Sequence, residues 1–188
     1  TRPRRRGTIP LRSRALRRPS FPVVVATTFL CAGVLTGLSI KGEYADAVAC
    51  VDLGKGNDVW YGGPADNCVK GGPGDDMLYG GGGNDRLFGG DGFDLVDGEN
   101  GNDYLEGNGN GDDVFGRAGN DELHGGVGAD FLLGGDGNDE MRGEKGNDWL
   151  DARDGYVDFV GGGVGRDTCQ YDLPPGVHDE RASCEEVR

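Results

Sequence analysis

Aspartate recurs every nine residues through most of the chain. From Leu53 the sequence divides without a gap into eleven nine-residue repeats, whose sixth position is Asp in ten cases and Asn67 in the other. Carboxylates in a regular row repel one another, and a cationic partner would relieve that repulsion. The sixth-position column is therefore a candidate set of cation ligands. Its ten aspartates are Asp58, Asp76, Asp85, Asp94, Asp103, Asp112, Asp121, Asp130, Asp139 and Asp148.

Two further columns keep the same period and must position these carboxylates. The eighth position is apolar throughout, and the fourth is glycine in nine of the eleven repeats, with Ala65 and Asn110 as exceptions. Glycines at the first, second and fourth positions predict a tight turn with positive φ. The last three residues then alternate out, in and out, as in a short strand. Because one repeat cannot bury its single apolar side chain alone, the repeats must stack.

The composition limits the partners of the repeat region. Glycine accounts for 39 of 188 residues, and residues 48–188 carry a net charge of −21. A surface this acidic repels nucleic acid and anionic membranes. It also repels itself, so either the segment is disordered or something cationic holds it together.

Residues 1–47 have a different character. An arginine-rich leader precedes an uncharged, mostly apolar run at 21–40, and small residues follow at 45–49. This layout predicts a secretory signal peptide. A retained anchor is the alternative, because twenty residues can span a bilayer. Either interpretation places the remaining chain outside the cytoplasm, secreted or anchored at the cell surface through 21–40.

Residues 71–79 (GGPGDDMLY) and 80–88 (GGGGNDRLF) match a known consensus column by column. They resemble the GGxGxDxUx repeats of the RTX, or hemolysin-type calcium-binding, family, and the resemblance covers about 53–170. It implies an all-β fold, a parallel β-roll (β-solenoid) of about 12–13 nonapeptide repeats with two repeats per turn. Residues 48–52 are expected to form an N-terminal cap strand, and 171–188 a C-terminal cap.

The resemblance also implies where Ca²⁺ binds. Each ion is expected between loops two repeats apart, held by both Asp carboxylates and by glycine-loop carbonyls, with about eight to nine ions in total. Such hard oxygen ligands suit Ca²⁺ better than a transition metal. The metal-free segment is expected to be largely disordered, with Ca²⁺ binding as its folding reaction. Asn67 removes one charge from the site that it shares with Asp85. Asn110, in place of glycine, is expected to alter the loop before Asp112. An extra residue near Ala152 interrupts the period, so the pairings of Asp158 and Asp167 are less regular. The expected loop glycines are Gly72, Gly74, Gly81, Gly83, Gly90, Gly92, Gly126, Gly128, Gly135 and Gly137.

Four cysteines lie outside the predicted signal peptide. Cys50 and Cys68 are 18 residues apart, which is one full turn of the implied roll, and neighbouring strands are close enough for a disulfide. Cys169 and Cys184 flank the C-terminal tail and predict a second bridge. Disulfides fit an exported protein.

Catalysis is not expected. Beyond residue 47 the only Ser or Thr residues are Thr168 and Ser183, and neither His124 nor His178 has an evident catalytic neighbour in the sequence. We therefore expect an extracellular structural, adhesive or interaction module; the alternative is the C-terminal or accessory calcium-binding part of an exported enzyme or toxin. One outer sheet is more apolar, through Tyr61, Phe131 and their neighbours. This face predicts binding of a protein, a second copy or a glycan, unless its aromatics only stack along the strands.

Overall fold

The computed structural model describes residues 49–172 and 180–186, all within one compact unit, Tyr44–Arg188. The predicted signal peptide or anchor lies outside the described residues, as do 173–179 and 187–188 of the predicted C-terminal cap. Within the described ranges, no helix has the length and apolar content needed to cross a bilayer.

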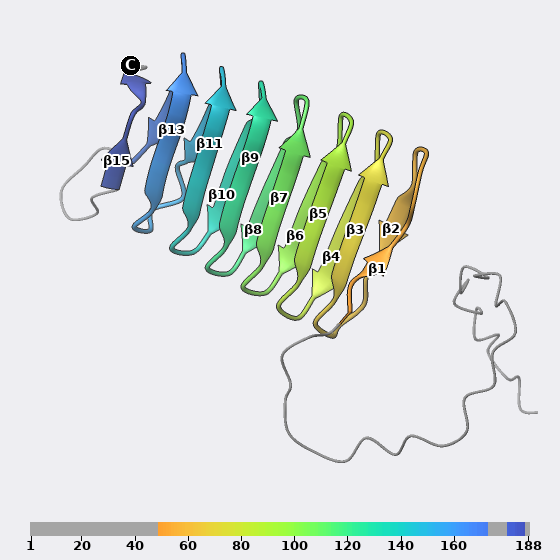
Figure 1. The fold of residues 1–188 in the computed structure, drawn as a ribbon. Coiled ribbons are helices and arrows are strands. Elements are labelled where there is room, and N and C mark those ends of the chain that lie inside the picture. Colours follow the sequence, from red (N-terminus) through yellow and green to blue (C-terminus); the bar gives the residue numbers. More distant parts are fainter. Residues whose placement is uncertain (1–48, 173–179, 187–188) are drawn as a thin grey trace, which may run out of the picture. The chain divides into compact units, whose positions relative to one another are not determined.

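The described chain forms two parallel sheets of eight strands each (Figure 1). One sheet has the order β1-β3-β5-β7-β9-β11-β13-β15 and the other β16-β14-β12-β10-β8-β6-β4-β2. The first contains β1 (Val51–Asp52), β3 (Cys68–Pro73), β5 (Arg86–Asp91), β7 (Tyr104–Gly109), β9 (Glu122–Gly128), β11 (Glu140–Gly146), β13 (Phe159–Gly165) and β15 (Glu180–Ala182). The second contains β2 (Val59–Tyr61), β4 (Met77–Gly82), β6 (Leu95–Asn100), β8 (Asp113–Ala118), β10 (Phe131–Asp136), β12 (Trp149–Ala152), β14 (Thr168–Tyr171) and β16 (Glu185–Glu186).

The strand register confirms the predicted parallel roll with two repeats per turn. Leu78 pairs with Val96, and Leu87 with Leu105, so that equivalent residues lie 18 apart. Consecutive repeats therefore alternate between the two sheets, and repeats two apart are neighbours in one sheet.

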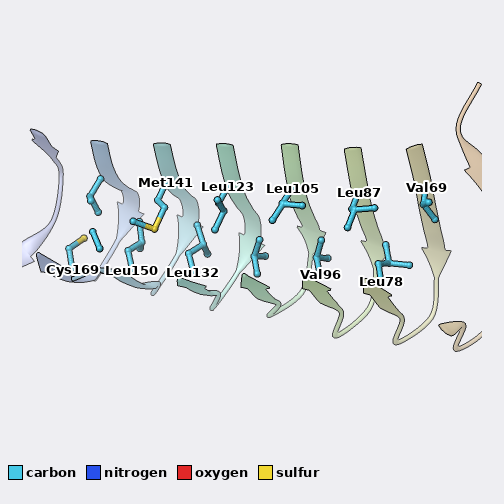
Figure 2. Close-up of a cluster of buried hydrophobic side chains, with 13 residues drawn as sticks. Val69, Leu78, Leu87, Val96, Leu105, Leu123, Leu132, Met141, Leu150 and Cys169 are labelled. Carbon is cyan, nitrogen blue, oxygen red and sulfur yellow. The ribbon is translucent and has the colours of Figure 1, made fainter. Parts of the chain in front are cut away.

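The core is a file of eighth-position side chains, with Ala152, in which rows from the two sheets face each other (Figure 2). Leu105 and Leu123 project from one sheet and Val96 and Leu132 from the other, each fully buried. Trp60, in the first repeat, only partly packs against this file. The stacked turns thus bury the apolar side chain that each repeat could not bury alone.

The strands are longer than predicted. β4 covers Met77–Gly82, so it includes the first three positions of the following repeat as well as the last three of its own. The first-position Gly80 is buried and does not have the predicted positive φ. In this repeat positive φ occurs at Gly81 and Gly83, so the backbone leaves extended geometry only after the first glycine.

Both ends of the roll carry a bonded cysteine pair. Cys50 is bonded to Cys68 beside the pairing of β1 with β3, and Cys169 of β14 to Cys184. The tail contributes strands that its sequence did not predict. β15 pairs with β13 and β16 with β14, which extends each sheet by one strand.

Candidate metal sites

The sixth-position aspartates form two stacks, one along each edge of the roll. Each aspartate lies at the end of a loop, directly before a strand. In each stack the Oδ1 of one aspartate accepts a hydrogen bond from the backbone N–H of the sixth residue one turn earlier. The Asp76 N–H donates to Asp94 Oδ1 at 2.8 Å, and the Asp85 N–H to Asp103 Oδ1 at 2.7 Å. These bonds fix the carboxylate orientation and leave Oδ2 for another partner.

Oδ2 of these aspartates is buried and accepts no hydrogen bond from the described residues. A buried carboxylate oxygen without a hydrogen-bond partner is strongly destabilising, so its repetition along both stacks indicates a site for a cation. The aspartates in this situation are Asp58, Asp76, Asp85, Asp94, Asp103, Asp112, Asp121, Asp130, Asp139, Asp148 and Asp167.

First-position glycines bring this oxygen close to the backbone. A Cβ added to Gly116 would lie 2.5 Å from Asp121 Oδ2 and 2.5 Å from the carbonyl oxygen of Gly134. A Cβ added to Gly89 would lie 2.5 Å from Asp94 Oδ2. Glycine is required here because the carboxylate packs against Cα, which is a different reason from the turn conformation that the sequence suggested.

The second- and fourth-position glycines supply the rest of the cradle. The ten predicted loop glycines all have positive φ, from 101° at Gly81 to 158° at Gly128. A Cβ on Gly72 would overlap the carbonyl oxygen of Gly54, and one on Gly92 that of Gly74. The loop carbonyls of one repeat therefore pack against the glycines two repeats later, and an oxygen-lined cation site needs carbonyls of this kind.

Burial changes the acid–base properties of the stacks. Removal from water raises the pKa of Asp112 and Asp139 to about 7, and that of Asp94 and Asp121 to about 6. Neighbouring aspartates raise these values further, whereas the backbone N–H on Oδ1 lowers them. The metal-free stack therefore disfavours its own charged form, which a bound cation would reverse.

Two departures from the consensus have different outcomes. Asn110 adopts φ 75° in place of glycine, and Asp112 stays buried with its N–H on Asp130 Oδ1 at 2.9 Å, so the predicted alteration of this loop does not reach the aspartate. The side-chain amide of Asn67 instead donates back to the carbonyl of Ala65. This position therefore offers no carboxylate to Asp85 in the next turn.

The stacks continue through the break in the period. The Asp139 N–H donates to Asp158 Oδ1 at 2.7 Å and the Asp148 N–H to Asp167 Oδ1 at 3.1 Å, across 19 residues instead of 18. Among the described residues, eleven such bonds join sixth positions two repeats apart, including the one from Asn67.

The turn before β13 brings in a carboxylate that the nine-residue pattern did not identify. Asp154 groups with Asp139 and Asp158, with one potential ligand oxygen of each within 4.8 Å of the others. The only sequence signal for it was the slip in the period near Ala152.

The comparison with protein families agrees with this geometry. Overlapping matches to the RTX calcium-binding nonapeptide repeat together span residues 51–169. The chain belongs to the RTX calcium-binding repeat family. No curated protein matches this RTX chain. Its carboxylate stacks and glycine cradles are thus those of a calcium-binding repeat, and Ca²⁺ is the cation that fits the buried Oδ2 atoms.

The outer faces of the RTX roll are partly covered by their own side chains. On the more apolar sheet, Arg117 forms an ion pair with Asp97 at 2.7 Å and lies over the Phe115 ring at 4.8 Å. Near β2 the face is open, with Val59 and Tyr61 56% and 73% exposed. The two predictions for this sheet therefore apply to different parts of it, stacking in the middle and exposed apolar surface near β2.

The histidines sit apart from the aspartate stacks or outside the described residues. His124 lies on the opposite sheet, with Glu122 and Glu144 each 3.0 Å from one of its ring nitrogens, and its ring contacts Tyr104. His178 is outside the described residues.

Proposed function

We propose that this chain is an extracellular protein whose roll folds when Ca²⁺ binds, and that it acts as a structural, adhesive or interaction module. The observation that carries the proposal is the file of buried Oδ2 atoms along both edges. Without a cation these atoms oppose folding, whereas with Ca²⁺ they become ligands shared between turns.

The number of ions follows from the stacked pairs. The regular repeats give nine pairs, for which we propose about eight to nine Ca²⁺, and the pairs reaching Asp158 and Asp167 provide two further candidates. Nine ions would bring a charge of +18 against the −21 of residues 48–188. Calcium would thus remove most of the self-repulsion that opposes a compact state.

Far-UV circular dichroism of the full chain, first in EDTA and then with Ca²⁺ raised to about 10 mM, tests the proposal. We expect a cooperative change from coil to β structure with Ca²⁺, and no such change with Mg²⁺, which tolerates only near-octahedral sites. A complete β spectrum in EDTA would show that stacking and disulfides are sufficient, and would contradict the proposed role of calcium.

Export forms part of the same proposal. The arginine-rich leader and the apolar run at 21–40 support a secretory signal, and two disulfides fit an oxidising compartment. N-terminal sequencing of protein recovered from the culture medium should find a start close to residues 46–50. Recovery of the intact N-terminus in the membrane fraction would favour an anchor instead.

The exposed apolar surface near β2 supports an interaction role. Val59, Tyr61 and Met77 are exposed side by side on β2 and β4. We propose this patch as the contact for a protein, a second copy or a glycan. If the partner is a second copy, replacing Tyr61 and Met77 with Ser should leave a monomer in analytical ultracentrifugation, where the wild-type protein associates.

A further inference from the structure

The turn between β12 and β13 is one residue longer than the other turns. The Asn138 N–H donates to Asn120 Oδ1 across 18 residues, whereas the Val157 N–H donates to Asn138 Oδ1 across 19. The hydrogen bond from the Gly137 N–H to Asp154 spans 17 residues, as the bond from the Gly119 N–H to Asp136 does in a regular loop. The extra residue is therefore Gly155 or Tyr156, just after Asp154, and not at Ala152.

This insertion lets a carboxylate replace a backbone carbonyl. In a regular loop the fourth-position N–H donates to the third-position carbonyl of the loop two repeats later. The Gly119 N–H donates in this way to the Asp136 carbonyl at 2.9 Å. The Gly137 N–H donates instead to Asp154 Oδ2 at 3.0 Å. Asp154 Oδ1 accepts the Tyr156 N–H at 2.8 Å, so both oxygens hold the side chain within the turn.

The result is a group of three carboxylates where the other turns have pairs. Asp139, Asp154 and Asp158 each place a ligand oxygen within 4.8 Å of the other two. Asp139 is only 3% exposed, and its Oδ2 accepts no hydrogen bond from the described residues. The buried oxygen of Asp139 independently indicates that a cation belongs at this turn.

We propose that Asp139, Asp154 and Asp158 form a three-carboxylate Ca²⁺ site that binds its ion more tightly than the regular pair sites. Two carboxylates only balance the charge of the ion, whereas a third leaves a net attraction, and ligand charge is one of the factors that set calcium affinity. This inference rests on the proposed calcium-dependent folding. It adds that the roll holds its most strongly bound ion beside β13.

Counting bound ions at limiting calcium tests this site directly. The full-length protein is equilibrated at a buffered free Ca²⁺ of about 1 µM and its bound ions are counted by native mass spectrometry, with a calorimetric titration for affinity. The variant is Asp154→Asn, which removes the charge but retains a side-chain oxygen. Asp91→Asn is the matched control, because Asp91 is an exposed third-position aspartate in a regular turn.

We expect Asp154→Asn to retain one ion fewer than the wild-type protein and to weaken the tightest binding step about tenfold or more. Asp91→Asn should retain the wild-type number. Equal ion counts and affinities in the two variants would overturn the three-carboxylate site while leaving calcium-dependent folding intact. Absence of any ion in the wild-type protein at about 10 mM Ca²⁺ would instead overturn the proposed function.

Circular dichroism at saturating Ca²⁺ checks that both variants are folded. Loss of one ligand charge should weaken a single ion and leave the β spectrum unchanged. A variant Asp154→Asn that stays unfolded at about 10 mM Ca²⁺ would mean that Asp154 is needed for the turn itself, and would count against a site that only adds affinity.

Discussion

The first-position glycine and the sixth-position aspartate of a repeat act as one structural unit. Gly116 is buried with Asp121 Oδ2 directly against it, so that the space a Cβ would occupy belongs to the carboxylate. The same pairing recurs at Gly89 with Asp94. The glycine column is therefore part of the metal site, in addition to its role in the backbone.

Replacing Gly116 with Ala should accordingly weaken calcium binding and folding together. Forcing a methyl group against Asp121 costs about 1–3 kcal/mol, because the carboxylate or the backbone must move. The Ca²⁺ midpoint of the circular dichroism change should rise. Gly63→Ala is the control, since a Cβ there meets nothing within 4 Å and Gly63 lacks positive φ. An equal effect of both substitutions would contradict a steric role for the carboxylate.

The raised pKa values predict how pH affects the metal-free chain. Burial raises the pKa of Asp112 to about 7 and that of Asp130 to about 6, from 3.8. Between pH 3.8 and about 7 the folded state therefore binds more protons than the unfolded state, so the stability of the folded state falls as pH rises through this range.

In EDTA, more β structure is thus expected at about pH 5 than at about pH 8. With Ca²⁺ the dependence should reverse, because protons compete with the ion for the same oxygens, so the Ca²⁺ midpoint should fall as pH rises. Circular dichroism titrations at both pH values measure each effect. A Ca²⁺ midpoint that is the same at both pH values would contradict the assigned burial of these carboxylates.

At the scale of elements, the nine-residue period predicted the strand positions and the inward side chains but not the strand length. β4 extends through Gly80–Gly82, and glycines carry no side chain whose alternation could reveal a strand. The position of the extra residue was likewise only approximate from sequence. The hydrogen bonds of Gly137 and Asn138 locate it after Asp154, and they depend on contacts between turns that a single sequence does not display.

The strands are held by one core side chain each, so truncating that side chain should be costly. Leu105 of β7 is fully buried in the file between the sheets. Leu105→Ala is expected to lower the free energy of unfolding in saturating Ca²⁺ by about 2–5 kcal/mol, measured by denaturant titration. Val127→Ala on β9, whose side chain is 56% exposed, should change it by no more than about 0.5 kcal/mol. Comparable losses would contradict a core built from the inward eighth-position side chains.

The whole described roll is a one-dimensional stack, in which each turn contacts only the turns before and after it. Stability in such a structure is a sum of turn and interface contributions, so the ends open more readily than the middle. The two disulfides lie at these ends, Cys50–Cys68 beside β1 and β3, and Cys169–Cys184 between β14 and the tail. Each should therefore protect its own end.

Removing one disulfide should loosen the roll locally. The double variant Cys50→Ser with Cys68→Ser loses a loop of 18 residues, worth about 3 kcal/mol in the chain-entropy model. Hydrogen exchange in saturating Ca²⁺ should accelerate in β1 and β3 and stay unchanged in β9. The variant Cys169→Ser with Cys184→Ser is the matched comparison, and should accelerate exchange in β14 without affecting β3. In a nearest-neighbour stack, protection from exchange is lost only at the end whose disulfide was removed. Faster exchange along the entire roll in either variant would therefore contradict this model and show that the roll unfolds as one cooperative unit.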